Sequence, residues 1–184
     1  FTGFDEQLHM RTLRDILASH QLFAPNALLE VSPRYPGLEA ATTLLHQLGV
    51  PTMVAATAVI LACRVVLVTV LCDATEQLTG NARAGGLAVA VYAISPQFVV
   101  FNSAFAYQTM AIPLALAAVS LIARARRSDA PLPFLAGATV CLMAVTLTHH
   151  VTSFLTAAFL LVWTMFERRG DRIWVAYGAC AAIA

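Results

Sequence analysis

The segment PTMVAATAVILACRVVLVTVL, residues 51–71, constrains this chain more than any other part of its sequence. Its only charged residue is Arg64, and its length matches the roughly 20 apolar residues that a helix needs to cross a bilayer. The whole chain is 59% hydrophobic and 11% charged, whereas about a quarter of the residues in a soluble domain are charged. The sequence therefore predicts an integral membrane protein.

Further apolar runs predict additional spans. Complete runs occupy 85–101, 105–123, 131–147 and 151–166, and a truncated run occupies 173–184. Pro96 and Pro113 lie inside the second and third spans and should kink them. We therefore predict an all-α polytopic membrane helical bundle. The chain begins at Phe1 and ends in an incomplete span, so we expect it to be a fragment of a longer protein.

The arginines predict the orientation of this bundle, because short cytoplasmic loops collect positive charge. Seven loop arginines fall on one side of the predicted membrane: Arg83, Arg124, Arg126, Arg127, Arg168, Arg169 and Arg172. The loops on the other side, at 102–104 and 148–150, contain none. We expect the arginine side to be cytoplasmic, in a bacterial plasma membrane, and residues 1–50 to be extracytoplasmic.

We predict two parts for the chain. Residues 1–50 are expected to form an extracytoplasmic first loop that carries surface helices, and residues 51–184 are expected to form a transmembrane bundle. The stretch FDEQLHMRTLRDILASH has apolar residues near helical spacing and acids at its start, which is typical of an amphipathic helix on a membrane surface. The turn-rich segments APN and SPRYPG follow, and a second helix is expected over 38–48.

Several function classes are disfavoured. The net charge is +1 and there is no lysine, so nothing indicates a nucleic-acid partner. There is no glycine-rich phosphate loop, which disfavours a cytosolic nucleotide sugar as donor. The cysteines show no CxxC spacing and are interpreted as small residues of membrane helices. They are Cys63, Cys72, Cys141 and Cys180.

Four motifs resemble blocks of the GT-C superfamily of membrane glycosyltransferases. FDEQLH is similar to the Phe-Asp-Glu-x-His pattern of protein O-mannosyltransferases, with one residue inserted before His9. YPGLEAAT, FNSAFAYQTMAIPLAL and THHVTSF resemble blocks of uncharacterised bacterial and archaeal members. The resemblance implies an inverting transfer of a sugar from a polyprenyl-phosphate donor to a glycan, lipid or protein hydroxyl on the extracytoplasmic face.

The resemblance implies Asp5 and Glu6 as the catalytic residues. Asp5 would be the base that accepts the proton of the acceptor hydroxyl, and Glu6 would orient Asp5 or bind the acceptor. The phosphate leaving group needs charge stabilisation more than a general acid. No cofactor is implied, and a divalent metal is disfavoured because the loops at 102–104 and 148–150 contain no second acid.

Seven further residues are predicted to bind substrate. They are His9, Arg34, Tyr35, Tyr107, Gln108, His149 and His150. Arg34, Tyr35 and the two adjacent histidines are candidates for the phosphate, and Arg34 is best suited by its planar fork. Tyr107 and Gln108 would line the sugar pocket. His9 lies one helical turn after Asp5, within reach of a hydrogen bond to it.

Each residue also has a structural interpretation that the sequence leaves open. The two acids can be helix caps, Arg34 can pair with Glu30, and the THH segment can be a turn at the membrane surface. Arg64 can extend towards the cytoplasm or contact a lipid carrier inside the bundle. Two other functions also stay open: a transporter or flippase of lipid-linked glycans, and a non-catalytic assembly subunit.

Overall fold

The computed structural model describes residues 3–28 and 30–166, and these residues form helices and connecting turns with no strand. The helices are α1 (Phe4–Ser19), α2 (Gly37–Gln47), α3 (Thr52–Thr79), α4 (Ala82–Ala93), α5 (Pro96–Val99), α6 (Tyr107–Ala125), α7 (Leu132–Thr146) and α8 (His150–Phe166). Two short 3₁₀ segments, η1 (Ser32–Arg34) and η2 (Phe101–Ser103), join them. The prediction of an all-helical fold is confirmed for these residues.

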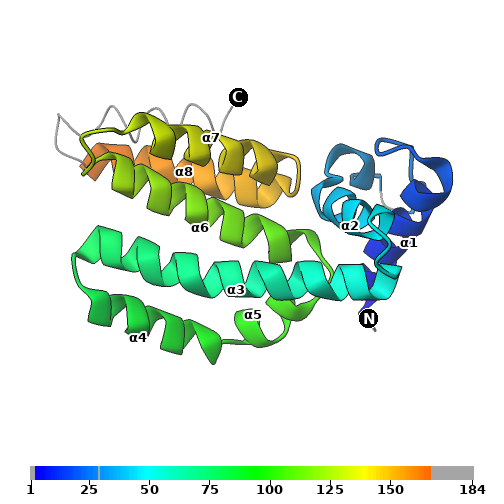
Figure 1. The fold of residues 1–184 in the computed structure, drawn as a ribbon, viewed down its shortest axis with the longest axis horizontal. Helices are drawn as coiled ribbons and strands as arrows, with labels where there is room; N and C mark the ends of the chain where they lie inside the picture. The colour runs from blue at the N-terminus through cyan, green and yellow to red at the C-terminus, as the bar shows by residue number, and fades with distance from the viewer. Residues whose placement is uncertain (1–2, 29, 167–184) are drawn as a thin grey trace.

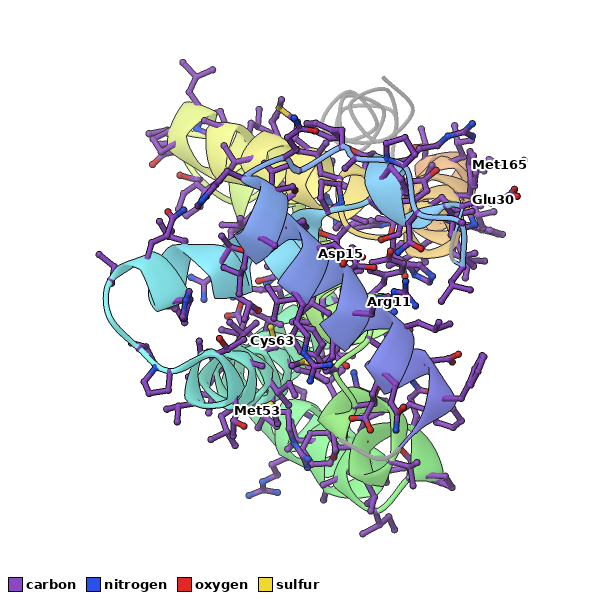
Figure 2. All side chains as sticks on the ribbon, turned by 90° about the vertical axis from the view of Figure 1, so that its right-hand side faces the viewer. Arg11, Asp15, Glu30, Met53, Cys63 and Met165 are labelled. Atoms are coloured by element: carbon purple, nitrogen blue, oxygen red, sulfur yellow. The ribbon has the colours of Figure 1, made fainter. Side chains whose placement is uncertain are left out.

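The long helices lie alongside one another, and α1 and α2 are packed together at one end of them (Figure 1). This is the end of α3 at which Thr52 lies, and we call it the α1–α2 end. The opposite end, where α6 finishes near Arg124, is called the Arg124 end. In Figure 2, α1 runs obliquely across the α1–α2 end.

Within the described residues, two helices are long and apolar enough to cross a membrane: α3, with 28 residues, and α6, with 19 residues. The expected second span is broken, because α4 and the segment 96–103 meet at an angle of 66°, and together they form a third candidate. α7 and α8 are apolar but have only 15 and 17 residues. The predicted sixth span, 173–184, lies outside the described residues.

The break in the second span has a local cause. Pro96 lacks a backbone N–H and favours the first position of a helix. The hydroxyl of Ser95 caps that new helix by accepting from the Phe98 N–H at 3.3 Å, and it also donates to the Tyr92 carbonyl at 2.7 Å. A new helix therefore starts at Pro96 instead of continuing α4. In contrast, α6 continues through Pro113.

Two apolar cores hold the molecule together. One joins α6, α7 and α8 through small and branched side chains, among them Ala118, Ala138 and Leu160. The other joins α1 and α2 to α3 and to the start of α6, and Leu13, Leu38 and Phe105 are completely buried in it. Burying such a side chain contributes about 1.5 to 3 kcal/mol. The second core fixes the helices of the first loop onto the long helices.

The start of α2 makes a close backbone contact with the turn between α7 and α8. The Gly37 N–H donates to the Leu147 carbonyl at 3.0 Å. A Cβ atom at Gly37 would lie 2.3 Å from the Thr148 hydroxyl oxygen. Glycine is therefore required at position 37 by the close approach of the two segments.

The three cysteines that lie within the described residues are free and sit in helices, as the sequence indicated. Cys72 contributes to the close packing of α3 on α4, since a Cβ at Gly85 would lie 2.7 Å from its carbonyl oxygen. Cys180 lies outside the described residues.

Candidate functional site

The predicted site residues other than Arg34 gather in two neighbouring places at the α1–α2 end. One is a groove of about 420 Å³ between the start of α1 and the η2–α6 segment, here called the acid groove. Its lining includes Asp5, Glu6, Phe101, Ser103, Ala104 and Gln108. The other is a set of rings from four segments, here called the histidine cluster: His9, Tyr35, Tyr107, His149 and His150.

Glu6 ties the start of α1 to the start of α6. One carboxylate oxygen, Oε1, accepts from the Phe105 N–H at 3.1 Å. The other, Oε2, accepts from the Gly3 N–H at 2.9 Å, which closes the capping arrangement of α1. Both oxygens are thus engaged with backbone donors, and the side chain holds α1 in place over the groove.

Asp5 is exposed, and it has no hydrogen-bond or ion-pair partner among the residues that the structure describes. It lines the acid groove together with Gln108, which is half-buried at the start of α6. The anchored neighbour, Glu6, keeps this carboxylate at the groove wall. The groove therefore offers one uncommitted carboxylate and one amide to a bound molecule.

The histidine cluster is built around a buried pair. His9 Nδ1 lies 2.9 Å from Glu39 Oε1, and the two residues are 5% and 0% exposed. This distance is that of a hydrogen bond between the imidazole and the carboxyl group. The His9 ring also meets the edge of Tyr107, with ring centroids 4.0 Å apart. The expected hydrogen bond from His9 to Asp5 is not formed, because Glu39 takes that place.

The remaining rings extend the cluster to the α7–α8 turn. The centroid of Tyr107 lies 6.1 Å from that of His149, and the two histidines are 5.5 Å apart. Tyr35, directly after η1, lies 4.9 Å from His150. Five residues that the sequence predicted to bind substrate are therefore in one contact network, although they come from distant parts of the chain.

The cluster contains buried polar atoms that lack a protein partner in the described ranges. These atoms include Oε2 of Glu39 and Nδ1 of His150. An unsatisfied buried polar atom costs about 1 to 3 kcal/mol. The cluster thus retains hydrogen-bonding capacity that the fold itself does not use.

His149 is held neutral at pH 7. Burial lowers the pKa of its imidazole below the usual value of 6.5, and the neighbouring charges of His150 and His9 lower it further. Its Nδ1 lies 2.7 Å from the Thr152 hydroxyl, which fixes the ring orientation. A neutral histidine can both donate and accept, so it is suited to hydroxyl groups at least as well as to phosphate.

Arg34 is part of neither the acid groove nor the histidine cluster. Its side chain is exposed on η1, and it forms no ion pair with Glu30 or with any other described residue. The acid groove and the histidine cluster are built without it.

Glu39 is the site residue that sequence reasoning missed. It lies in the quoted motif YPGLEAAT, one position after the buried Leu38, and three residues before the buried Thr42. An acid on the apolar face of a predicted helix was the available signal. It was not decisive, because the burial comes from α1 and from the rings of the cluster.

A second polar pair lies at the Arg124 end. Arg124 Nε donates to Asp73 Oδ2 at 3.2 Å, and Nη2 donates to Oδ1. The Ser120 hydroxyl also donates to Oδ2. Both oxygens of Asp73 are thus engaged, and the pair ties α3 to α6.

No group of three or more histidine, cysteine, aspartate or glutamate side chains is placed to hold a metal ion within residues 3–28 and 30–166. Comparison of the chain with protein-family models, curated proteins and solved structures finds no match. The resemblance to the GT-C superfamily therefore rests on the four sequence motifs alone.

Proposed function

We propose that this chain belongs to a GT-C-like membrane glycosyltransferase that transfers a sugar from a polyprenyl-phosphate donor to an acceptor hydroxyl on the extracytoplasmic face. The observation that carries the proposal is the uncommitted carboxylate of Asp5 in the acid groove, at the end of two long apolar helices. A donor with a membrane-bound chain and a polar head would present its head at such a place.

The proposed chemistry is a direct displacement at the anomeric carbon. The acceptor oxygen forms the new bond to that carbon, and its proton passes to the Asp5 carboxylate. The bond from the anomeric carbon to the phosphate oxygen breaks, and the polyprenyl phosphate leaves with the electron pair. The sugar is inverted because the acceptor enters opposite the leaving group.

Under this proposal the other groove residues position the reactants. Glu6 holds α1 by accepting from the Phe105 N–H, so it acts as a positioning residue rather than as a second base. Gln108 supplies an amide to the sugar hydroxyls. The histidine cluster supports α1 through His9 and Glu39, and it offers polar atoms to the part of the substrate that reaches it.

The test is transfer from a radiolabelled polyprenyl-phosphate sugar in membranes that contain the full-length protein. Asp5→Asn should lower transfer by about 10²- to 10⁴-fold, which is the usual contribution of a general base. Asp15→Asn is the matched control, because Asp15 lies further along α1 and pairs only with Arg11 at 3.9 Å (Figure 2). Equal transfer by wild type and Asp5→Asn would refute the proposal.

The break at Pro96 and the intramembrane Arg64 favour a second candidate, a transporter or flippase of lipid-linked glycans. A transporter should keep its transport rate in Asp5→Asn unless that acid carries coupled protons. The same variant therefore separates the two candidates. A non-catalytic assembly subunit would show neither activity.

A further inference from the structure

Arg64 is the only charged residue between Thr52 and Cys72, which is the apolar part of α3. A charge at such a position is costly in a bilayer, and it persists where it has a partner or a function. The sequence left two explanations open: extension towards the cytoplasm, or a contact inside the bundle.

The structure shows a contact inside the bundle. Nη1 of Arg64 donates to the Ser103 hydroxyl on η2. The guanidinium carbon lies 4.3 Å from the centroid of the Phe98 ring on α5. The expectation that Arg64 extends towards the Arg124 end is wrong, because side chains on a helix tilt towards its N-terminus, and the N-terminus of α3 is at the α1–α2 end.

This guanidinium is incompletely satisfied. In the described part of the chain, no carboxylate forms an ion pair with it, and neither Nε nor Nη2 has a hydrogen-bond partner. Arg124, at the other end of the bundle, binds both oxygens of Asp73. Arg64 therefore has donors left for an anion, and the planar fork suits a carboxylate or phosphate.

The anion would reach Arg64 through the acid groove. Ser103, the hydrogen-bond partner of Arg64, is itself part of the groove wall. The groove lining also contains exposed apolar side chains: Phe4, Val100 and Phe101 are each at least half exposed. Exposed apolar side chains in the lining, together with an arginine directly behind Ser103, fit a molecule that has an apolar chain and an anionic head.

We propose that Arg64 binds the phosphate of a lipid whose headgroup enters the acid groove beside Ser103. The guanidinium binds two phosphate oxygens and keeps or exchanges its bond to Ser103. Asp5 lies on the same groove and repels the phosphate, so the anion is held at the Arg64 side and the rest of the headgroup lies towards Asp5. The identity of the lipid as a polyprenyl phosphate rests on the proposed function, whereas phosphate binding by Arg64 does not.

The test measures binding without any transfer reaction. Purified full-length protein in neutral phosphatidylcholine nanodiscs is titrated with a polyprenyl phosphate, with phosphatidylglycerol and with inorganic phosphate. Arg64→Gln should weaken polyprenyl phosphate binding about ten- to hundredfold, as expected for a lost charged hydrogen bond. Arg64→Lys should recover part of the affinity. The matched control is Arg83→Gln, which removes an exposed arginine on α4.

A second variant keeps the test valid if Arg64→Gln does not fold. Ser103→Ala removes the protein partner of Arg64 and leaves the charge in place. If Arg64 only ties α3 to η2, Ser103→Ala lowers stability as Arg64→Gln does and leaves lipid binding unchanged, and the proposal fails. If Arg64 is a phosphate site, Ser103→Ala leaves an arginine with one more free donor and binds the lipid phosphate more tightly than wild type.

The three ligands distinguish the source of the phosphate. A loss in Arg64→Gln that is confined to polyprenyl phosphate supports the proposal together with the proposed lipid. An equal loss for phosphatidylglycerol supports the phosphate site and rejects polyprenyl selectivity. Binding of inorganic phosphate as tightly as either lipid, or unchanged lipid binding in folded Arg64→Gln, overturns the proposal. Asp5→Asn should still bind lipid, so failure of the transfer proposal is separable.

Discussion

The two ends of the bundle each contain a carboxylate paired with a basic side chain, but the two pairs differ in completeness. At the Arg124 end, the Asp73 and Arg124 side chains are 26% and 44% exposed, and both carboxylate oxygens are engaged. At the α1–α2 end, Glu39 is fully buried, and only one of its oxygens meets a partner, His9. In the partly exposed pair, both carboxylate oxygens already have hydrogen-bond donors from the protein. A buried, half-engaged pair is costly.

The difference indicates that the two pairs have different roles. The Asp73 pair ties α3 to α6, and both oxygens of its carboxylate are engaged. The Glu39 pair holds α1 and α2 together while leaving polar atoms inside the histidine cluster, next to the uncommitted Asp5. Polar groups that the fold does not use are characteristic of sites that bind something else. The comparison can be tested at three levels.

The largest expected effect comes from breaking the buried pair. His9→Ala leaves both oxygens of the buried Glu39 carboxyl without a hydrogen-bond partner and removes the ring that packs on Tyr107, which should destabilise the protein by about 3 to 5 kcal/mol. Thermal unfolding of the purified protein in detergent measures the change. Replacing both members by leucine should recover much of the loss, since a well-packed apolar pair often replaces a buried ion pair without cost.

Asp73→Asn is the contrasting variant at the other end. It should lower the free energy of unfolding by no more than about 1 kcal/mol, because partly exposed ion pairs contribute little to stability. If Asp73→Asn and His9→Ala destabilise the protein equally, the distinction between the two ends is wrong.

An intermediate effect is expected from separating α2 from the α7–α8 turn. Gly37→Ala places a Cβ 2.3 Å from the Thr148 hydroxyl oxygen and 3.1 Å from the Leu147 carbonyl oxygen. Overpacking of this kind costs about 1 to 3 kcal/mol, and it should disturb the cluster while leaving the Asp73 pair intact. Stability and protease sensitivity of residues 20–37 report the change.

Gly86→Ala is the control for this substitution, because nothing lies within 4 Å of a Cβ at that position of α4. It should leave stability unchanged or raise it slightly, since alanine favours a helix over glycine by about 1 kcal/mol. A loss of stability in Gly86→Ala comparable to that in Gly37→Ala would remove the packing explanation.

The smallest effect concerns pH. The pKa of His149 in the folded protein lies below its usual 6.5 because of burial and of the charges of His150 and His9. The unfolded chain therefore binds a proton more readily than the folded chain. This contribution to stability is complete above about pH 6.5 and is lost as the pH falls from there through the folded pKa. Melting temperature should decline from pH 7 to pH 5.

His149→Gln should flatten this decline, because it removes the group that the unfolded chain protonates. His20→Asn is the control. His20 is exposed, and its backbone adopts the left-handed conformation with φ 57°, which asparagine tolerates. An identical pH dependence in wild type and His149→Gln would show that other groups set it.

Apolar length allowed the long helices to be predicted, but their ends depend on other interactions. The run at 51–71 became α3, which continues to Thr79 because its polar residues after Cys72 pair with α6 instead of ending the helix. The run at 85–101 was predicted as one span, yet Ser95 and Pro96 start a new helix within it. The run at 105–123 forms α6, which is long enough to cross, whereas the runs at 131–147 and 151–166 form helices shorter than a typical crossing.

The candidate site was predictable as a set of residue types but not as an arrangement. Acids at the start of an amphipathic helix and two histidines between apolar runs were visible in the sequence. Their division between a groove and a buried cluster was not, because it depends on α1 crossing the start of α6, where Tyr107 faces one way and Gln108 the other. Glu39 was missed for the same reason: its burial is a property of the packed helices.

The long-range anchors of α1 and α2 also set an order of events during synthesis. The Glu6 carboxylate cannot accept its hydrogen bond from the Phe105 N–H until that residue, 99 positions later in the chain, has been synthesised. At about 5 to 20 residues per second, the ribosome needs about 5 to 20 seconds to reach it, and the Leu147 carbonyl that receives Gly37 comes later still. The groove and the cluster are thus completed only after the long helices exist, so a nascent chain contains neither of them.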